Sequence, residues 1–459
     1  MQSIERDLQT QQPKIQRVDI HMRKNQNFAK YFSPRMLSIG PIHHGKENLR
    51  LGEHYKLIWT AMYLKESKQN PEDLCQKIEL HIEEVKGFYT KEAIGDYNDN
   101  DLVWMLFVDG CSVLQIMQKL DAVHPKKLRI KFDQQEHVIM DLHLLENQVP
   151  YKVLELLSNN DEAMLLHSMF NLGFDGFLSY IVYDSLIPFN DSESWAKIFE
   201  KLLSDEDLPQ AKRKPNHVLD FVRLMFLKID YKDLMVNKSK QENEIPKKGD
   251  GEHKIDVKGR HSSWLTYKNI RELKAAGIQV RKNETLCLNN VSFVSKWFSG
   301  ELTLPWFHVD ELFFYIYLNM IAYEKCPDFH YNYDICSYLA FLDTLVDDAN
   351  DLKELRLAGV CQNTLGSDEE VAKLLNSIGT ELASKEFCLL STGMMAYNEK
   401  YTRVRDEIKK HCNTKWKTWM AQVYNTHFSN PWSICAFLAA ALALVLTAIQ
   451  TWLAFLSNN

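Results

Sequence analysis

Apolar residues recur along most of the chain every three or four positions, which is the spacing of helices that face a core. The clearest example follows Pro71, where charged residues occupy the opposite face. The pattern predicts a surface helix with a buried face of Leu74, Ile78, Ile82, Val85 and Tyr89. A second stripe predicts one long helix with an intramolecular core face, made by Phe387, Leu390, Met394, Tyr397, Tyr401, Val404 and Ile408.

Alternation of apolar and polar positions predicts a minor β element. It occurs at Leu128, Ile130 and Phe132 and resumes at Val138 and Met140, which predicts a small hairpin. A second strand-like region runs from Gly277 to Pro305. The fold class is therefore mainly α with a minor β element, built as a large helical soluble domain.

One internal segment loses nearly all apolar content. Charged residues of both signs, with proline and glycine, dominate 236–263, which is typical of a polar linker or insertion. The segment divides the predicted soluble part into an N-terminal helical lobe over 1–235 and a C-terminal helical lobe, with the small β element, over 264–425.

The last strongly apolar stretch, 433–456, contains no charged residue. Its 24 positions would span roughly 36 Å as a helix, enough to cross a hydrocarbon core of about 30 Å, and predict one C-terminal transmembrane helix. A buried core helix is the alternative, which the length and the polar tail disfavour. The predicted anchor residues are Trp432, Ser433, Leu446, Trp452 and Leu456, with the tryptophans near the two interfaces.

The orientation of this predicted anchor rests on charge. Lys409, Lys410, Lys415 and Lys417 precede the segment and no charge follows it, so the positive-inside rule favours a cytosolic domain. The expectation is a single-pass, tail-anchored protein of the plasma membrane or an endomembrane. Four glycosylation-type triplets oppose this orientation; they begin at Asn190, Asn237, Asn283 and Asn290.

Small and polar residues share one face of the same segment. Their spacing of 4, 3, 4 and 3 predicts a helix-pairing seam for self-association or a partner helix, consisting of Ala436, Ala440, Ala443, Thr447 and Gln450. An alanine-rich helix also produces such a stripe by accident.

Composition narrows the class of protein. The chain has 459 residues, 45% of them hydrophobic and 25% charged, which is typical of a globular protein. The net charge of -7 gives no reason to expect nucleic acid as a partner. Nine scattered cysteines without a paired motif indicate reduced, mostly buried thiols, and the charged N-terminal residues do not resemble a secretory signal.

Asp347, Asp348 and Asp351 form the most enzyme-like motif. A DDxxD pattern on a helix can hold magnesium against a diphosphate, so a magnesium-dependent enzyme is the alternative function. The competing interpretation is that these carboxylates simply lie in solvent at a helix end. No second metal-binding helix accompanies them, so no metal, cofactor or catalytic residue is predicted.

Two further polar motifs have structural interpretations. His43 and His44 lack the spacing of a metal site and predict a turn with a hydrogen-bonded histidine. Glu146, Asn147 and Gln148 lie between apolar positions, and predict a buried hydrogen-bond network that fixes packing. The sequence contains no P-loop, GxGxxG, GxSxG or kinase signature.

Ordered sequence blocks resemble the plant family named domain of unknown function 247. They are YFSP at 31–34, SIGPIHHG at 38–45, FVDGC at 107–111, DLHLLENQVP at 141–150, RELKAAGI at 271–278, LNMIAYEKC at 318–326, LGSDEEVAKLLN at 365–376, NPWS at 430–433 and LTAIQT at 446–451. Departures are modest: Val18-Asp19 replaces the usual Val-Pro, and Ile42 replaces the usual tyrosine.

The resemblance implies a plant protein without an assigned enzymatic activity, generally predicted to be membrane-bound. Some similar proteins look like pollen-side recognition determinants of grass self-incompatibility. The predicted function is therefore a membrane-anchored protein-interaction or signalling component with a protein partner, and not an enzyme.

Overall fold

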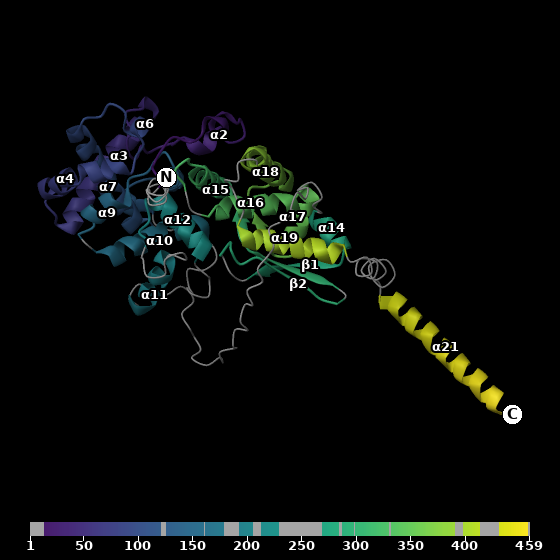
Figure 1. The fold of residues 1–459 in the computed structure, drawn as a ribbon. Helices are drawn as coiled ribbons and strands as arrows, with labels where there is room; N and C mark the ends of the chain where they lie inside the picture. The colour runs from purple at the N-terminus through teal and green to yellow at the C-terminus, as the bar shows by residue number, and fades with distance from the viewer. Residues whose placement is uncertain are drawn as a thin grey trace, which may run out of the picture.

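The computed structural model describes residues 13–120, 125–159, 161–178, 192–204, 213–228, 269–283, 287–297, 299–329, 332–390, 398–413 and 431–457. These parts are mainly helical, with two small sheets, which confirms that component of the predicted fold class (Figure 1).

The first half of the chain is helical throughout its described parts. Its α-helices are α2 (Ile20–Lys24), α3 (Arg50–Ser67), α4 (Pro71–Leu80), α5 (Ile82–Gly87), α6 (Lys91–Ile94), α7 (Asp99–Lys119), α8 (Phe132–Leu142), α9 (Tyr151–Leu157), α10 (Glu162–Leu178), α11 (Ser192–Leu203) and α12 (Val218–Lys228). Short 3₁₀ turns are η1 (Ala29–Phe32), η2 (Glu47–Leu49) and η3 (Pro125–Leu128).

The second half combines helices with the sheets. Its helices are α14 (Ile270–Ala275), α15 (Glu311–Glu324), α16 (Asp334–Leu345), α17 (Ala349–Leu357), α18 (Asp368–Leu390), α19 (Glu399–Cys412) and α21 (Pro431–Ser457). The strands are β1 (Ile278–Asn283), β2 (Ser292–Ser295), β3 (Gly300–Pro305), β4 (Phe307–Val309) and β5 (Cys361–Asn363).

The sheets are built largely from the region expected to hold strands. In the three-stranded sheet, of order β1-β3-β2, β3 pairs parallel to β1 and antiparallel to β2. In the two-stranded sheet β4 pairs parallel to β5. The strand prediction between Gly277 and Pro305 is therefore confirmed.

Helix α15 lies in the middle of the core. Nearly all its residues are buried, and it packs against α12, α16, α8, η1 and β4, which come from both halves of the chain. Asn319 of α15 accepts a hydrogen bond from Leu145 N and donates one to Tyr31 O. The buried apolar side chains accordingly form one cluster that extends from Ile15 to Ile408.

The helix predicted after Pro71 is present, divided into α4 and α5. Pro71 lies at its first position and Asn70 caps it by accepting a hydrogen bond from Glu72 N. His81 separates the two pieces. All five residues of the predicted face, from Leu74 to Tyr89, are buried, which confirms the prediction.

The predicted hairpin around Leu128 and Met140 is wrong, because helix α8 occupies most of it. Lys131 N donates to Gln134 Oε1, which fixes the first turn of the helix. Gln135, Val138 and Leu142 follow at helical spacing and form its buried face. The alternation at Leu128, Ile130 and Phe132 was too short to determine a strand.

The long helix predicted across Phe387 to Ile408 is also wrong. Helix α18 is described as far as Leu390, Met394 and Tyr397 of the predicted stripe lie outside the described residues, and α19 begins at Glu399 with Asn398 as its non-helical cap. Asn398 Oδ1 accepts a hydrogen bond from Lys400 N, which starts a new helix. Within α19 the predicted face is correct, because Tyr401, Val404 and Ile408 are buried.

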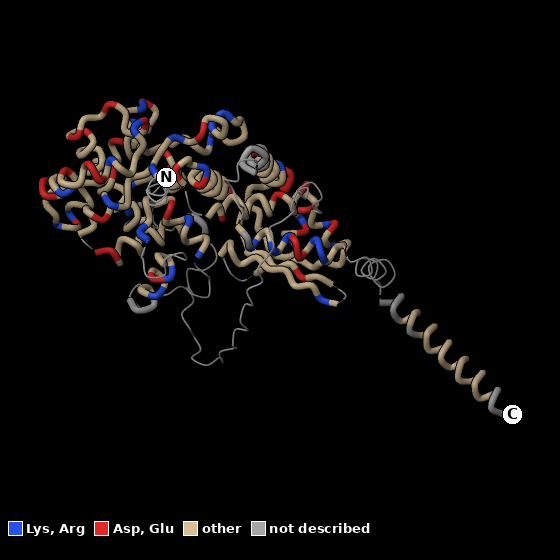
Figure 2. Tube along the Cα trace, in the orientation of Figure 1, with Lys and Arg blue, Asp and Glu red and all other residues tan. Residues whose placement is uncertain are grey.

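The predicted transmembrane helix requires the main correction. Residues 433–456 do lie in one helix, α21, which carries no charged residue and extends away from the body (Figures 1 and 2). Nevertheless, no helix in the described parts of the chain combines the length and the apolarity needed to cross a membrane.

The roles assigned to the individual anchor residues remain predictions. Leu446 and Trp452 are exposed on α21, and the side chains of Trp432, Ser433 and Leu456 lie outside the described ones. Within the pairing seam, Thr447 Oγ1 donates to Ala443 O of its own helix. The seam itself remains a prediction, with Ala440 and Gln450 exposed on α21 and the side chain of Ala436 outside the described set.

The remaining domain predictions are not decided. The polar segment 236–263 lies outside the described residues, between α12 and α14. The lobe boundaries 1–235 and 264–425 therefore remain predictions. None of the cysteines whose side chains are described forms a disulfide, as expected, and most of them are buried.

Candidate functional site

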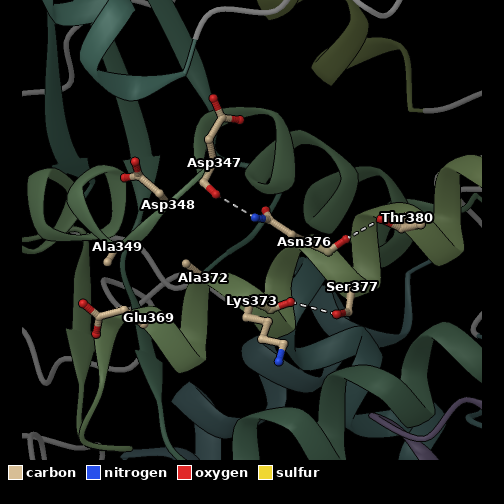
Figure 3. A pocket seen from close by; sticks show the side chains of 9 residues that line it. All are labelled: Asp347, Asp348, Ala349, Glu369, Ala372, Lys373, Asn376, Ser377 and Thr380. Atoms are coloured by element: carbon tan, nitrogen blue, oxygen red, sulfur yellow. Dashed lines mark hydrogen bonds between the residues drawn. The ribbon is translucent and has the colours of Figure 1, made fainter.

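A surface groove with a volume of about 420 Å³ lies between the first turn of α17 and the first half of α18. Figure 3 shows its side chains: Asp347, Asp348, Ala349, Glu369, Ala372, Lys373, Asn376, Ser377 and Thr380. This α17–α18 groove includes two of the three aspartates of the DDxxD motif and part of the LGSDEEVAKLLN block.

Two aspartates of the motif build the start of α17. The Asp348 carboxylate caps the helix by accepting from the backbone N–H groups of Asn350 and Asp351. The Asp351 carboxylate accepts in return from the N–H groups of Asp347 and Asp348, 3.1 and 3.3 Å away, which completes a capping box.

Arg271 of α14 donates further hydrogen bonds to both of these carboxylates. Its Nε donates to Asp351 Oδ1 at 2.9 Å and its Nη2 to Asp348 Oδ2 at 2.7 Å. Asp351 is fully buried, so its charge requires this partner. No group of three or more histidine, cysteine, aspartate or glutamate side chains in the described residues could hold a metal ion. The motif thus acts as a helix cap, with the Asp348 and Asp351 carboxylates engaged by backbone N–H groups and by Arg271.

The inner wall of the groove is held by hydrogen bonds along α18. Asn376 Nδ2 donates to Asp347 O at 2.8 Å, which ties α18 to the loop before α17. Ser377 Oγ donates to Lys373 O and accepts from Asn27 Nδ2, while Thr380 Oγ1 donates to Asn376 O. The ammonium of Lys373 has no acidic partner among the described residues, and it points away from Asp347 and Asp348 (Figure 3).

Asp343 lies behind the groove, on α16. Its burial, together with the negative charge of Asp347, raises the pKa of this carboxyl group to about 7. The carboxyl group also lies directly against the Cα of Gly379 on α18. The pKa of Asp343 therefore depends both on the packing of α16 against α18 and on the charge of Asp347 in the groove.

A second polar region surrounds the motif Glu146-Asn147-Gln148, as predicted. Asn147 Oδ1 accepts from Ile39 N, and its Nδ2 donates to Leu37 O and Asp141 O. Gln148 Nε2 donates to the carbonyl groups of Leu142 and Leu144. The Asn147 amide therefore fastens the segment before α9 to Leu37 and Ile39, and the Gln148 amide satisfies carbonyl groups at and after the end of α8.

His43 and Glu146 meet at the centre of this region, both fully buried. His43 Nε2 lies 3.0 Å from Glu146 Oε2 and His43 Nδ1 lies 2.7 Å from Lys46 Nζ. Residues 41–45 form a turn, which confirms the structural role predicted for this motif. Burial and the nearby charges of Lys46, Arg23 and Arg17 lower the pKa of His43 to about 3, so His43 is neutral at pH 7.

A buried ion pair next to this region was missed in the sequence. Lys56 Nζ lies 2.6 Å from Asp109 Oδ1 and also donates to Ser38 O. Asp109 Oδ2 accepts from Gly40 N, so the pair positions the same loop. The available signal was Asp109 itself, a charged residue within the otherwise apolar helix α7.

Comparisons with known proteins agree with this structural picture. The family model of a plant protein of unknown function, DUF247, matches residues 15–446. The chain belongs to this family. It is 23% identical to the UPF0481 protein At3g47200 of Arabidopsis thaliana over 93% of this chain and 83% of that protein. It is also 22% identical to the putative UPF0481 protein At3g02645 of the same plant, over 91% and 86%. No solved structure matches the chain.

Proposed function

We propose that this protein is a protein-interaction component that receives a polar segment of a partner in the α17–α18 groove. The observation that carries the proposal is the groove itself, about 420 Å³ in volume and lined by charged, amide and hydroxyl side chains. That volume is within the range of ligand sites, which is roughly 300–1,000 Å³. The Thr380 hydroxyl is fixed by a hydrogen bond to its own helix and the Asn376 amide by one to the loop before α17, which pre-organises the surface for binding.

The charge pattern favours a particular kind of partner. Three carboxylates line the groove, those of Asp347, Asp348 and Glu369, against one ammonium, that of Lys373. Arg271 compensates Asp348, and Asn269 Nδ2 donates to Asp347 Oδ2, so Glu369 and Lys373 are the charges most available to a partner. A segment with a basic residue near Glu369 and an acidic residue near Lys373 complements this arrangement.

The test is proximity labelling of the full chain in plant tissue, followed by binding measurements with the partner recovered. Thr380→Arg fills the groove and Lys373→Glu reverses its one cation. Both positions are exposed, so neither change disturbs the core. Each change should weaken partner binding at least tenfold, which is about 1.4 kcal/mol.

Lys353→Glu supplies the matched control, because Lys353 is exposed on α17 but does not line the groove. It makes the same change of charge and should leave binding unaltered. The proposal is wrong if no reproducible protein partner is recovered, or if Thr380→Arg binds the partner as tightly as the unaltered chain.

A further inference from the structure

Basic side chains converge on the buried carboxylate of Glu146, far from the α17–α18 groove in the sequence. Arg23 of α2 contacts Glu146 Oε1, and the same oxygen accepts a hydrogen bond from Val18 N at 2.6 Å. Arg17 immediately precedes Val18 in the chain, so its backbone lies next to the one that contacts this carboxylate. Lys46 joins the cluster through His43, whose Nδ1 lies 2.7 Å from Lys46 Nζ.

The charges in this cluster do not balance. Arg17, Arg23 and Lys46 carry three positive charges, His43 is neutral, and Glu146 supplies one negative charge. Arg23 compensates Glu146, which is fully buried. In the described part of the chain Arg17 and Lys46 have no carboxylate partner, whereas nearby Lys56 has two, Glu53 and Asp109.

The three cations lie close enough to repel one another. Partial burial and the charges of Arg23 and Arg17 lower the pKa of Lys46, and burial with the charge of Arg17 lowers the pKa of Arg23. Such a concentration of like charge is unfavourable in the free protein. A bound anion would remove the repulsion and gain three charge-assisted hydrogen-bonding partners.

The cluster is accessible from solvent. Arg17 and Lys46 are exposed residues, and the Arg23 side chain is 28% exposed, while Glu146 and His43 beneath them are buried. Two guanidinium groups and one ammonium match an oxyanion with several charged oxygens better than a single carboxylate, which would leave positive charge uncompensated.

We propose that Arg17, Arg23 and Lys46 form a binding site for a polyvalent oxyanion of the phosphate class. Glu146 and His43 are positioning residues of this site: Glu146 orients Arg23 and His43, and His43 accepts a hydrogen bond from Lys46. The ligand binds as an anion, without a covalent step.

The experiment measures binding of pyrophosphate and inorganic phosphate to the full chain by calorimetry and by the shift in Tm, at constant ionic strength. Both anions should raise Tm, pyrophosphate more than phosphate, and acetate should not. Arg17→Gln and Lys46→Gln should each weaken pyrophosphate binding at least fivefold, and the double variant should abolish it. Neither side chain pairs with a described carboxylate, and each change relieves repulsion among the cations, so neither variant should lower the Tm of the anion-free protein.

Lys65→Gln is the matched control, since Lys65 is exposed on α3 and the change removes the same charge. It should bind pyrophosphate as the unaltered chain does. A second arm uses vesicles of phosphatidylcholine with and without phosphatidic acid. If the protein also binds phosphatidic acid, and the double variant loses this binding, the oxyanion is a lipid headgroup. If the protein does not bind phosphatidic acid, the oxyanion is a soluble molecule. The proposal is overturned if neither pyrophosphate nor phosphatidic acid binds, if acetate has the same effect at equal ionic strength, or if Lys65→Gln loses binding equally.

Discussion

The carboxyl group of Asp343 lies directly against the backbone of Gly379, where α16 packs on α18. A methyl group on Gly379 would overlap both carboxyl oxygens, so glycine is required here by close approach. The same packing partly shields Asp343 from water, and this shielding is the largest cause of the rise in its pKa.

Gly379→Ala should therefore destabilise the protein, despite the preference of helices for alanine. The intrinsic gain is about 1 kcal/mol, while overpacking costs about 1–3 kcal/mol. Urea unfolding should show a net loss. In an Asp343→Ala background, which removes the overlapping carboxyl group, the same change should become stabilising. Equal effects in the two backgrounds would show that the contact is absent.

Stability should fall as pH rises through the folded pKa of Asp343. The folded value of about 7 lies above the ordinary value of 3.8, so the folded state holds this proton more tightly than the unfolded state. The contribution of the protonated carboxyl group is complete below about pH 4 and is lost progressively up to about pH 7. Asp343→Asn should flatten the decrease in Tm between pH 5 and 8. An unchanged pH profile in this variant would refute the assignment.

Lys56→Met should be among the most damaging single changes, because it leaves the buried Asp109 carboxylate without its cation. Breaking such a pair costs about 3–5 kcal/mol, and denaturant unfolding measures it. Lys65→Met on the exposed side of α3 is the control and should cost less than about 0.5 kcal/mol. A loss below 1 kcal/mol for Lys56→Met would mean that Asp109 is protonated or otherwise compensated.

Magnesium should leave the Tm unchanged, because Asp348 and Asp351 are used by the helix cap and by Arg271. A ligand that binds the folded state raises its stability in proportion to RT ln(1 + [L]/Kd), so a site with useful affinity would be detected by titration of the metal. Arg271→Ala should lower the Tm both with and without magnesium. A rise in Tm that depends on Asp347 and Asp348 would restore the metal-site interpretation.

Local patterns predicted the elements whose signals were long and repeated. The face from Leu74 to Tyr89 and the strands between Gly277 and Pro305 are present where expected, because periodicity reports directly which side of an element is buried. The helix at Phe132 and the break at Asn398 were missed. Both depend on one capping side chain, which a stripe of apolar residues does not reveal.

For the polar motifs, too, the sequence predicted part of the structure and only the fold decided the rest. The sequence indicated that Glu146, Asn147 and Gln148 would be buried and bonded, since polar residues amid apolar ones need partners. It could not identify those partners, because Ile39, Leu37 and Arg23 lie more than a hundred residues away along the chain. The spacing of Asp347, Asp348 and Asp351 likewise permits a metal site or a capping box, and Arg271 from a distant helix decides between them.

By itself, the sequence determined the mainly helical fold class and the buried character of its polar blocks, because these follow from local periodicity and composition, and its ordered blocks resembled the family to which the chain belongs. Only the tertiary structure decided which charges are compensated. It paired Lys56 with Asp109 and Arg271 with Asp351, and it left Arg17 and Lys46 without a described carboxylate partner. It also overturned the predicted C-terminal anchor, because no helix in the described parts of the chain is long and apolar enough to cross a membrane. Charge compensation depends on distance in space, and one chain's order of residues does not contain that distance.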